Sequence, residues 1–148
     1  MTFSSEDKAT LETEVARAFS SLAASGFVQT AVQVKHGALG DLLETTLVND
    51  ALNRRVRIHL LRADQRENVA VFVERIDKGT FLIDTFLKWK GASSERLKQC
   101  DLSTYSGSLA ERLSGCLSFS NTVLEKDLSS VLRGASWPDV PIDWGDYR

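Results

Sequence analysis

The sequence predicts an α+β domain with an N-terminal helix, an antiparallel β-meander and C-terminal helices around one core. Three observations support this fold class. Apolar residues recur at helical spacing in residues 5–25, alternate at strand spacing in residues 53–89, and return to helical spacing after residue 93. We expect an antiparallel sheet of four or five strands within residues 27–89, with the C-terminal helices packed on one of its faces.

The first element is a helix predicted over residues 5–25. Its apolar stripe consists of Leu11, Val15, Ala18, Phe19, Leu22 and Ala23. Ser4 or Ser5 can cap this helix, because a short hydroxyl accepts a hydrogen bond from a free amide in the first turn. Gly26 stands where a left-handed residue commonly ends a helix, and Phe27 can fold back onto the last turn.

Two segments before the meander differ in how clearly they are defined. Residues 27–35 alternate between apolar and polar side chains, which predicts a strand with one face on the core. Residues 38–50 fit a helical stripe as well as a strand. We favour a strand over residues 43–48 because of its β-branched content, with Asn49 and Asp50 as turn residues.

The meander itself is predicted as three strands, over residues 54–63, 68–76 and 80–89. The polar connections between them are too short for a parallel crossover, so neighbouring strands must be antiparallel. Alternation in the first strand turns Arg57 to solvent. The second strand is apolar on both faces, so we expect it to be central and covered on two sides.

Helices are predicted again within residues 94–133. After a short turn capped by Ser94, two apolar stripes follow, and they fit either one kinked helix or two helices. We favour two, because Thr122 and Glu125 have the spacing of a capping box at which a new helix can begin. Gly134 is expected to end the second helix.

The tail, residues 135–148, is dense in aromatic and acidic side chains. Pro138 and Pro141 exclude a regular helix there. The candidate partner-binding residues are Trp137, Asp139, Asp143, Trp144, Asp146 and Tyr147. Tryptophan and tyrosine are enriched at binding hot spots, and aspartates can engage a basic groove. The alternative is a strap in which Trp137, Ile142 and Trp144 pack back on the domain, and one strap can serve both purposes.

Length and composition place the chain among ordinary globular proteins. Its 148 residues fit a single domain spanning 1–148, without a visible repeat or linker. We expect a cytoplasmic protein without membrane contact, because neither a signal peptide nor an apolar run of membrane-spanning length is visible. Cys100 and Cys116 are expected to be free thiols, since two distant cysteines make neither a disulfide scaffold nor a zinc site.

No motif for catalysis, cofactor binding or metal binding is visible, so we expect no enzyme and no cofactor. The bases available for a catalytic triad are His36 and His59, and His59 lies within a predicted strand. A nucleophile elbow, a phosphate-binding glycine loop and a zinc-binding helix motif are all missing from the sequence.

Charge is distributed unevenly along the chain. Residues 51–100 carry eleven basic and six acidic groups, whereas both flanking regions are acidic. Either acidic helices lie over a basic sheet, or a basic patch binds an anionic partner. The basic cluster comprises Arg54, Arg55, Arg57, Arg62 and Arg66. We expect no nucleic-acid partner, because no aromatic residues interleave with these arginines and the pI is about 5.7.

The order of helix, meander and helices, with the tail Trp-Pro-Asp-Val-Pro-Ile-Asp-Trp at residues 137–144, resembles small bacterial immunity proteins. These proteins accompany polymorphic toxins and contact-dependent inhibition systems. The resemblance implies a protein partner, namely one cognate toxin whose active site or other essential surface is blocked inside the producing cell. It assigns no family site residues to this sequence.

Two further classes stay open. Chaperones for secreted effectors are also small, acidic α+β proteins, but they usually dimerise and insert a helix within the strand series. Three uninterrupted strands are predicted here, which favours the immunity protein and leaves the oligomeric state open. A small enzyme or ligand carrier would need polar pocket residues, and Asp84 on a predicted apolar strand face is the one hint of such a pocket.

Overall fold

The computed structural model describes residues 3–38, 40–63, 66–77 and 79–140. The chain begins with helices α1 (Ser5–Ala18) and α2 (Ser20–Ala24). The strands are β1 (Val28–Gln29), β2 (Gln33–Gly37), β3 (Gly40–Asn49), β4 (Arg54–Ala63), β5 (Arg66–Arg75) and β6 (Gly79–Leu82). They are followed by α3 (Ile83–Trp89), α4 (Ser94–Lys98), the 3-10 turn η1 (Leu102–Thr104), α5 (Leu109–Lys126) and α6 (Ser129–Leu132).

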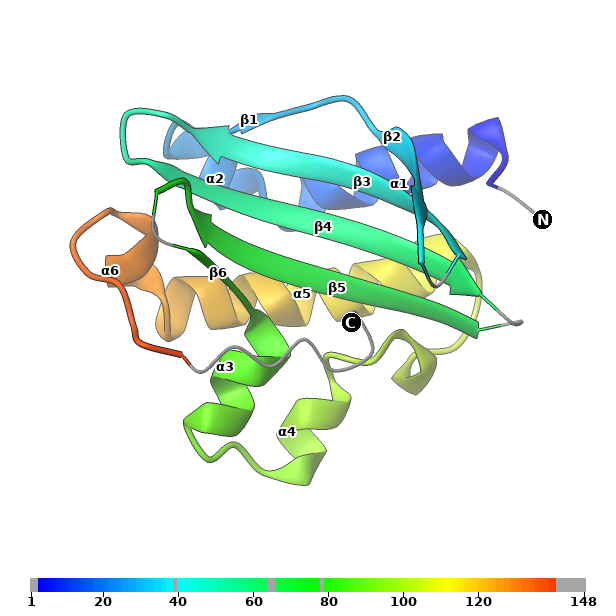
Figure 1. Cartoon of the computed structure of the whole chain (residues 1–148). Coiled ribbons are helices and arrows are strands. Elements are labelled where there is room, and N and C mark those ends of the chain that lie inside the picture. Colours follow the sequence, from blue (N-terminus) through cyan, green and yellow to red (C-terminus); the bar gives the residue numbers. More distant parts are fainter. Residues whose placement is uncertain (1–2, 39, 64–65, 78, 141–148) are drawn as a thin grey trace.

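The strands form one antiparallel sheet in the order β1-β3-β4-β5-β6, with β2 also paired to β3. Helices α1 and α5 lie behind this sheet in Figure 1, and the other face of the sheet is turned toward the viewer. We call the covered face the helix face and the opposite one the outer face. The predicted α+β class, with an N-terminal helix, an antiparallel sheet and C-terminal helices packed on the sheet, is confirmed.

The predicted N-terminal helix is present but is divided at Phe19 into α1 and α2. Ser4 caps α1: its side chain accepts a hydrogen bond from the Asp7 amide, and the Asp7 carboxylate accepts one from the Ser4 amide. Gly26 has a φ of 98°, and the Phe27 amide donates to the Leu22 carbonyl, which closes the end of α2.

The strand predicted over residues 27–35 is two short strands, so the sheet has six strands rather than four or five. Thr30 lies in the interruption and is held to β3 by three hydrogen bonds. Its amide donates to the Thr46 carbonyl at 2.8 Å, and its hydroxyl accepts from the Thr46 amide at 3.0 Å. Its carbonyl accepts from the Thr45 hydroxyl at 2.8 Å. The side-chain bonds take the place of a regular ladder at this edge.

The meander is confirmed for β4, whose bounds match the prediction, and for β5, which is shifted by two residues at its start and one at its end. The ambiguous segment 38–50 contains the strand β3. The middle strand of the sheet is β4 rather than β5. Both faces of β5 are nevertheless apolar and buried, with Val71 and Val73 on the helix face and Ala70 and Phe72 on the outer face.

The strand predicted over residues 80–89 is wrong beyond Leu82, because residues Ile83–Trp89 form α3. Apolar side chains occupy so many positions here that both a two-residue and a helical period fit the segment. The helical period decides the structure, since Ile83, Phe86 and Leu87 at helical spacing are all buried in the core.

The preference for two C-terminal helices around residue 122 is also wrong, because α5 runs unbroken through this region. The polar side chains stay inside the helix by bonding to the preceding turn. Ser120 donates to the Cys116 carbonyl and Thr122 to the Ser118 carbonyl, each at 3.1 Å. Gly134 ends α6 with a φ of 80°, as predicted.

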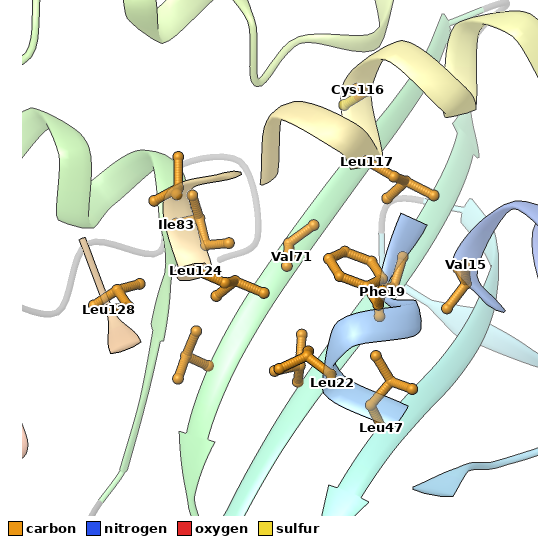
Figure 2. Close-up of a cluster of buried hydrophobic side chains, with 14 of the residues drawn as sticks. Val15, Phe19, Leu22, Leu47, Val71, Ile83, Cys116, Leu117, Leu124 and Leu128 are labelled. Atoms are coloured by element: carbon orange, nitrogen blue, oxygen red, sulfur yellow. The ribbon is translucent and has the colours of Figure 1, made fainter. Parts of the chain in front are cut away.

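One hydrophobic core lies between the helix face of the sheet and the helices. Figure 2 shows Val71 and Leu47 of the sheet near side chains from α5 and from the α1–α2 segment. Phe19, at the break between α1 and α2, is 1% exposed, so the interruption of the helix places a large ring in the core. No helix in the described ranges is long and apolar enough to cross a membrane.

Gly115 lies inside α5, where the Tyr105 ring packs directly against the helix backbone. A Cβ atom at position 115 would overlap ring atoms Cδ1 and Cε1 of Tyr105. The ring cannot simply move away, because its hydroxyl donates to the Gln99 carbonyl at 2.8 Å. The glycine is therefore required by packing rather than by backbone conformation.

We predict that Gly115→Ala destabilises the fold by about 1–3 kcal/mol, because overpacking outweighs the better helix propensity of alanine. In a Tyr105→Ala background the same change should stabilise α5 by about 1 kcal/mol. Urea unfolding of the four proteins of this double-mutant cycle measures both values. A Gly115→Ala variant that is more stable in both backgrounds contradicts the packing argument.

Candidate functional site

The sequence-predicted tail begins with a well-anchored residue. Trp137 is half-buried and its ring lies 5.2 Å from that of Phe81 in β6. The guanidinium groups of Arg54 and Arg75 lie 5.2 Å and 5.8 Å from the same ring. Trp137 thus packs as the strap interpretation predicts.

Of the remaining tail candidates, the structure describes only Asp139. Asp139 is exposed, and Val140 is half-buried against the core. The other candidates lie outside the described residues: Asp143, Trp144, Asp146 and Tyr147. The segment up to residue 140 is therefore fixed to the fold at Trp137, with the first tail carboxylate at the surface.

Arg54 holds the chain segment that precedes Trp137. It is 4% exposed, and its Nε donates to the Val131 carbonyl of α6 at 2.7 Å. Its Nη2 donates to the Ser136 carbonyl, next to Trp137, at 3.2 Å. Burial, and then the neighbouring Arg75, lower the pKa of Arg54, whereas the nearby Asp77 carboxylate acts to raise it. One arginine thereby ties β4 to α6 and to the start of the tail.

The arginine cluster seen in the sequence is divided between the two faces of the sheet. Arg54 and Arg62 belong to the helix face, where Arg62 pairs with Asp7 of α1 at 3.1 Å. Arg55 and Arg57, one residue out of phase, belong to the outer face. The cluster is therefore not one basic patch. The Arg62–Asp7 pair matches the expectation that acidic helix residues meet basic sheet residues.

The outer face carries a network that sequence analysis did not identify, which we call the outer-face cluster. It consists of Glu44 from β3, Arg57 and His59 from β4, and Phe72 and Glu74 from β5. Cross-strand register brings these residues together, although they are up to 30 positions apart in the chain. The alternation of β4 was a signal for their common face, but their partners could be found only from the register.

Glu44 and Glu74 flank Arg57 in this cluster. Arg57 pairs with Glu74 and lies 3.9 Å from Glu44, and its guanidinium carbon is 4.8 Å from the centre of the Phe72 ring. His59 Nε2 lies 2.8 Å from Glu44 Oε2, and the imidazole meets Phe72 edge to face at 4.9 Å. The cluster combines ion pairs with aromatic packing, which restrains each of its long side chains.

Burial lowers the pKa of His59, although the hydrogen bond to Glu44 acts in the opposite direction. In the neutral form, Nε2–H donates to Glu44 and Nδ1 carries the lone pair. This Nδ1 is buried and has no partner among the described residues. A base without a neighbouring nucleophile and without solvent access is unsuited to general base catalysis in this arrangement.

His36 and the two cysteines are the other candidate chemical groups. His36 is exposed at the end of β2 and lies 2.6 Å from Asp41. Cys116 donates to the Cys100 carbonyl at 3.4 Å, and burial raises the pKa of both thiols to about 12, so neither is an activated nucleophile. No group of three potential metal ligands occurs in the described ranges.

Asp84 does not lie on an apolar strand face as predicted. It is exposed in the first turn of α3, and its carboxylate accepts a hydrogen bond from the Thr85 amide at 2.7 Å. The ligand-pocket hypothesis for this residue rested on a strand at residues 80–89. Since that part of the chain is helical beyond Leu82, the hypothesis loses its structural basis.

The lowered pKa of His59 predicts a pH dependence of stability. The unfolded chain protonates near the ordinary histidine pKa of 6.5, whereas the folded protein resists protonation until a lower pH. The contribution of neutral His59 to the free energy of unfolding is therefore fully present above pH 6.5, and it decreases as the pH falls below 6.5. We expect His59→Gln to remove this part of the dependence in urea unfolding between about pH 7.5 and about pH 5. His36→Gln is the control, and equal slopes for the wild type and His59→Gln would refute the argument.

No protein-family model matches this chain, and neither a curated protein nor a solved structure matches it. A function must therefore be argued from the residues themselves. The two arrangements available for that argument are the anchored start of the tail and the outer-face cluster.

Proposed function

We propose that this chain is a non-catalytic binding module, an immunity protein that binds and neutralises a cognate bacterial toxin in the cytoplasm of the producing cell. The observation that carries the proposal is the anchorage of Trp137 between Phe81 and the guanidinium groups of Arg54 and Arg75. A segment fixed at one end loses less conformational freedom on binding than a free terminus does.

The composition beyond this anchor suits recognition of a basic protein surface. Asp139 is exposed, and the sequence continues with Asp143, Trp144, Asp146 and Tyr147. Carboxylates beside aromatic rings can imitate the phosphates and bases that a nucleic-acid-cleaving toxin binds. Such charges increase the association rate, while the aromatic residues supply buried area.

A non-catalytic role is supported by the separation of the candidate chemical groups in the described part of the chain. His59 is bound to Glu44 with its second nitrogen buried, and the thiols of Cys100 and Cys116 have pKa values raised to about 12. An immunity protein needs none of these groups to react, because it acts by occupying a surface of its toxin.

We expect the combined change Asp139→Asn, Asp143→Asn and Asp146→Asn to weaken toxin binding by about tenfold or more, mainly through slower association. The melting temperature should stay nearly unchanged. Binding kinetics at two salt concentrations measure the effect. The matched control changes three exposed carboxylates elsewhere, Glu6, Glu12 and Glu95, to glutamine. If this control weakens binding equally, or if the tail variant binds as the wild type does, the tail is not the toxin-binding surface.

A growth assay tests the function as a whole. The C-terminal domain of the protein encoded immediately upstream, expressed from an inducible promoter, is expected to stop bacterial growth. Co-expression of this chain should restore growth, and the triple asparagine variant should restore it less well. Growth arrest that this chain does not relieve refutes the immunity function. Dimerisation together with transport of an intact effector would instead identify a chaperone.

A further inference from the structure

The outer face of the sheet is buried, although the helices α1 and α5 lie on the other side of the sheet (Figure 1). The buried apolar side chains of the described helices all belong to the core on the helix face. The outer face has a separate apolar cluster of Ala70, Phe72 and Leu82, which come from β5 and β6. Ala70 is 5% exposed and Leu82 is 8% exposed. A sheet face open to water would leave such side chains far more accessible, so part of the chain covers this face.

The polar side chains of the outer face are removed from water as well. His59 is 9% exposed, and its Nδ1 has almost no accessible surface. The same holds for Nε of Arg55 and Nε of Arg57. Phe72 has a further interaction besides those with Arg57 and His59. The outer face is therefore a covered surface.

The segments outside the described ranges differ in whether they can supply this cover. Residues 1–2 precede Phe3, which is buried in the core of the helix face with the Arg62 guanidinium 4.6 Å from its ring. Positions 39, 64–65 and 78 belong to short connections between paired strands, at the ends of the sheet. None of these can lie over the middle of the outer face. Residues 141–148 are the one such segment with the length to do so.

The described part of the chain ends close enough to the outer face for this segment to reach it. Trp137 packs against Phe81 of β6, with 5.2 Å between the ring centres, and β6 is an edge strand of the sheet. Eight residues follow position 140 and span about 26 Å when extended. The strand β4 lies two strand spacings from β6, which is about 10 Å. The segment is therefore long enough to pass the edge at β6 and cross β5.

The chemistry of residues 141–148 also matches the outer face. Ile142 and Trp144 are two residues apart, so in an extended segment they share one side. Asp143 and Asp146 make the segment acidic. Four cations on the outer face of the described strands stand against the two carboxylates of Glu44 and Glu74: Lys35, Arg55, Arg57 and Arg66. This excess of positive charge favours an acidic cover, and the apolar pair supplies most of the binding free energy.

We propose that residues 141–148 form a strap across the outer face, running from β6 toward β4 with Trp144 over the cluster of Ala70, Phe72 and Leu82. Trp144 then serves the fold, while the carboxylates of the tail and Tyr147 are left for the toxin. The strap is a property of the isolated chain, so it does not depend on the proposed toxin neutralisation.

Two measurements on the full chain without a toxin test the strap. Nuclear magnetic resonance should show nuclear Overhauser contacts between the indole protons of Trp144 and the methyl groups of Ala70 and Leu82. Modification by diethyl pyrocarbonate reports on the accessibility of His59. Trp144→Ala should increase the rate of this modification by about tenfold, because loss of a packed aromatic side chain favours the lifted strap.

Two controls accompany the modification experiment. His36 is exposed, so its rate should be the same in every variant. Trp89→Ala removes an exposed tryptophan of α3 and should leave the His59 rate within about twofold. Equal His59 rates in the wild type and Trp144→Ala overturn the proposal, and so does a wild-type spectrum without contacts from Trp144 to either methyl group. The second result stands even if Trp144→Ala fails to fold, because it needs no variant.

Discussion

The two-residue period of β4 is the constraint on which the rest of this structure depends. Val56, Ile58 and Leu60 are fully buried on the helix face, where the apolar stripes of α1 and α5 meet the sheet. The same period forces the intervening residues, including Arg57 and His59, onto the outer face. A shift of one residue in register would exchange the two sets, burying an arginine in the core and exposing three branched side chains. Hydrophobic burial therefore fixes both the core and the position of the outer-face cluster.

The same alternation places an arginine at each end of the covered face. At one end Arg54 donates to carbonyls of α6 and of the segment before Trp137. At the other end Arg62 and Arg112 share Glu67, so α5 is tied to the sheet by ion pairs. Burial acts to raise the pKa of Glu67, but hydrogen bonds from the two arginines outweigh it and the pKa is lowered. Arginine hydrogen bonds and ion pairs thus lie at both ends of a core whose middle is apolar.

The outer face has a different physical character from the helix face. Within the described residues its apolar cluster consists of Ala70, Phe72 and Leu82, and Arg57 and His59 pack against Phe72. Ion pairs hold Arg57 between two carboxylates, which restrains its long side chain.

The sequence by itself narrowed the cap of α1 to Ser4 or Ser5, and it determined the fold class, the strand β4, most of β5 and the left-handed glycines that end α2 and α6. These features depend on local periodicity and on residues within one turn of each other, so they can be recognised in a single chain segment. Some segments, such as Ile83–Trp89, fit both a strand and a helical period. Their secondary structure depends on which side chains reach the core. The sequence also did not show that α5 is continuous. Its polar residues Ser120 and Thr122 stay within the helix because their hydroxyls donate to carbonyls of the preceding turn. The outer-face cluster depends on strand register, which pairs residues distant in the chain, and only the tertiary structure specifies it.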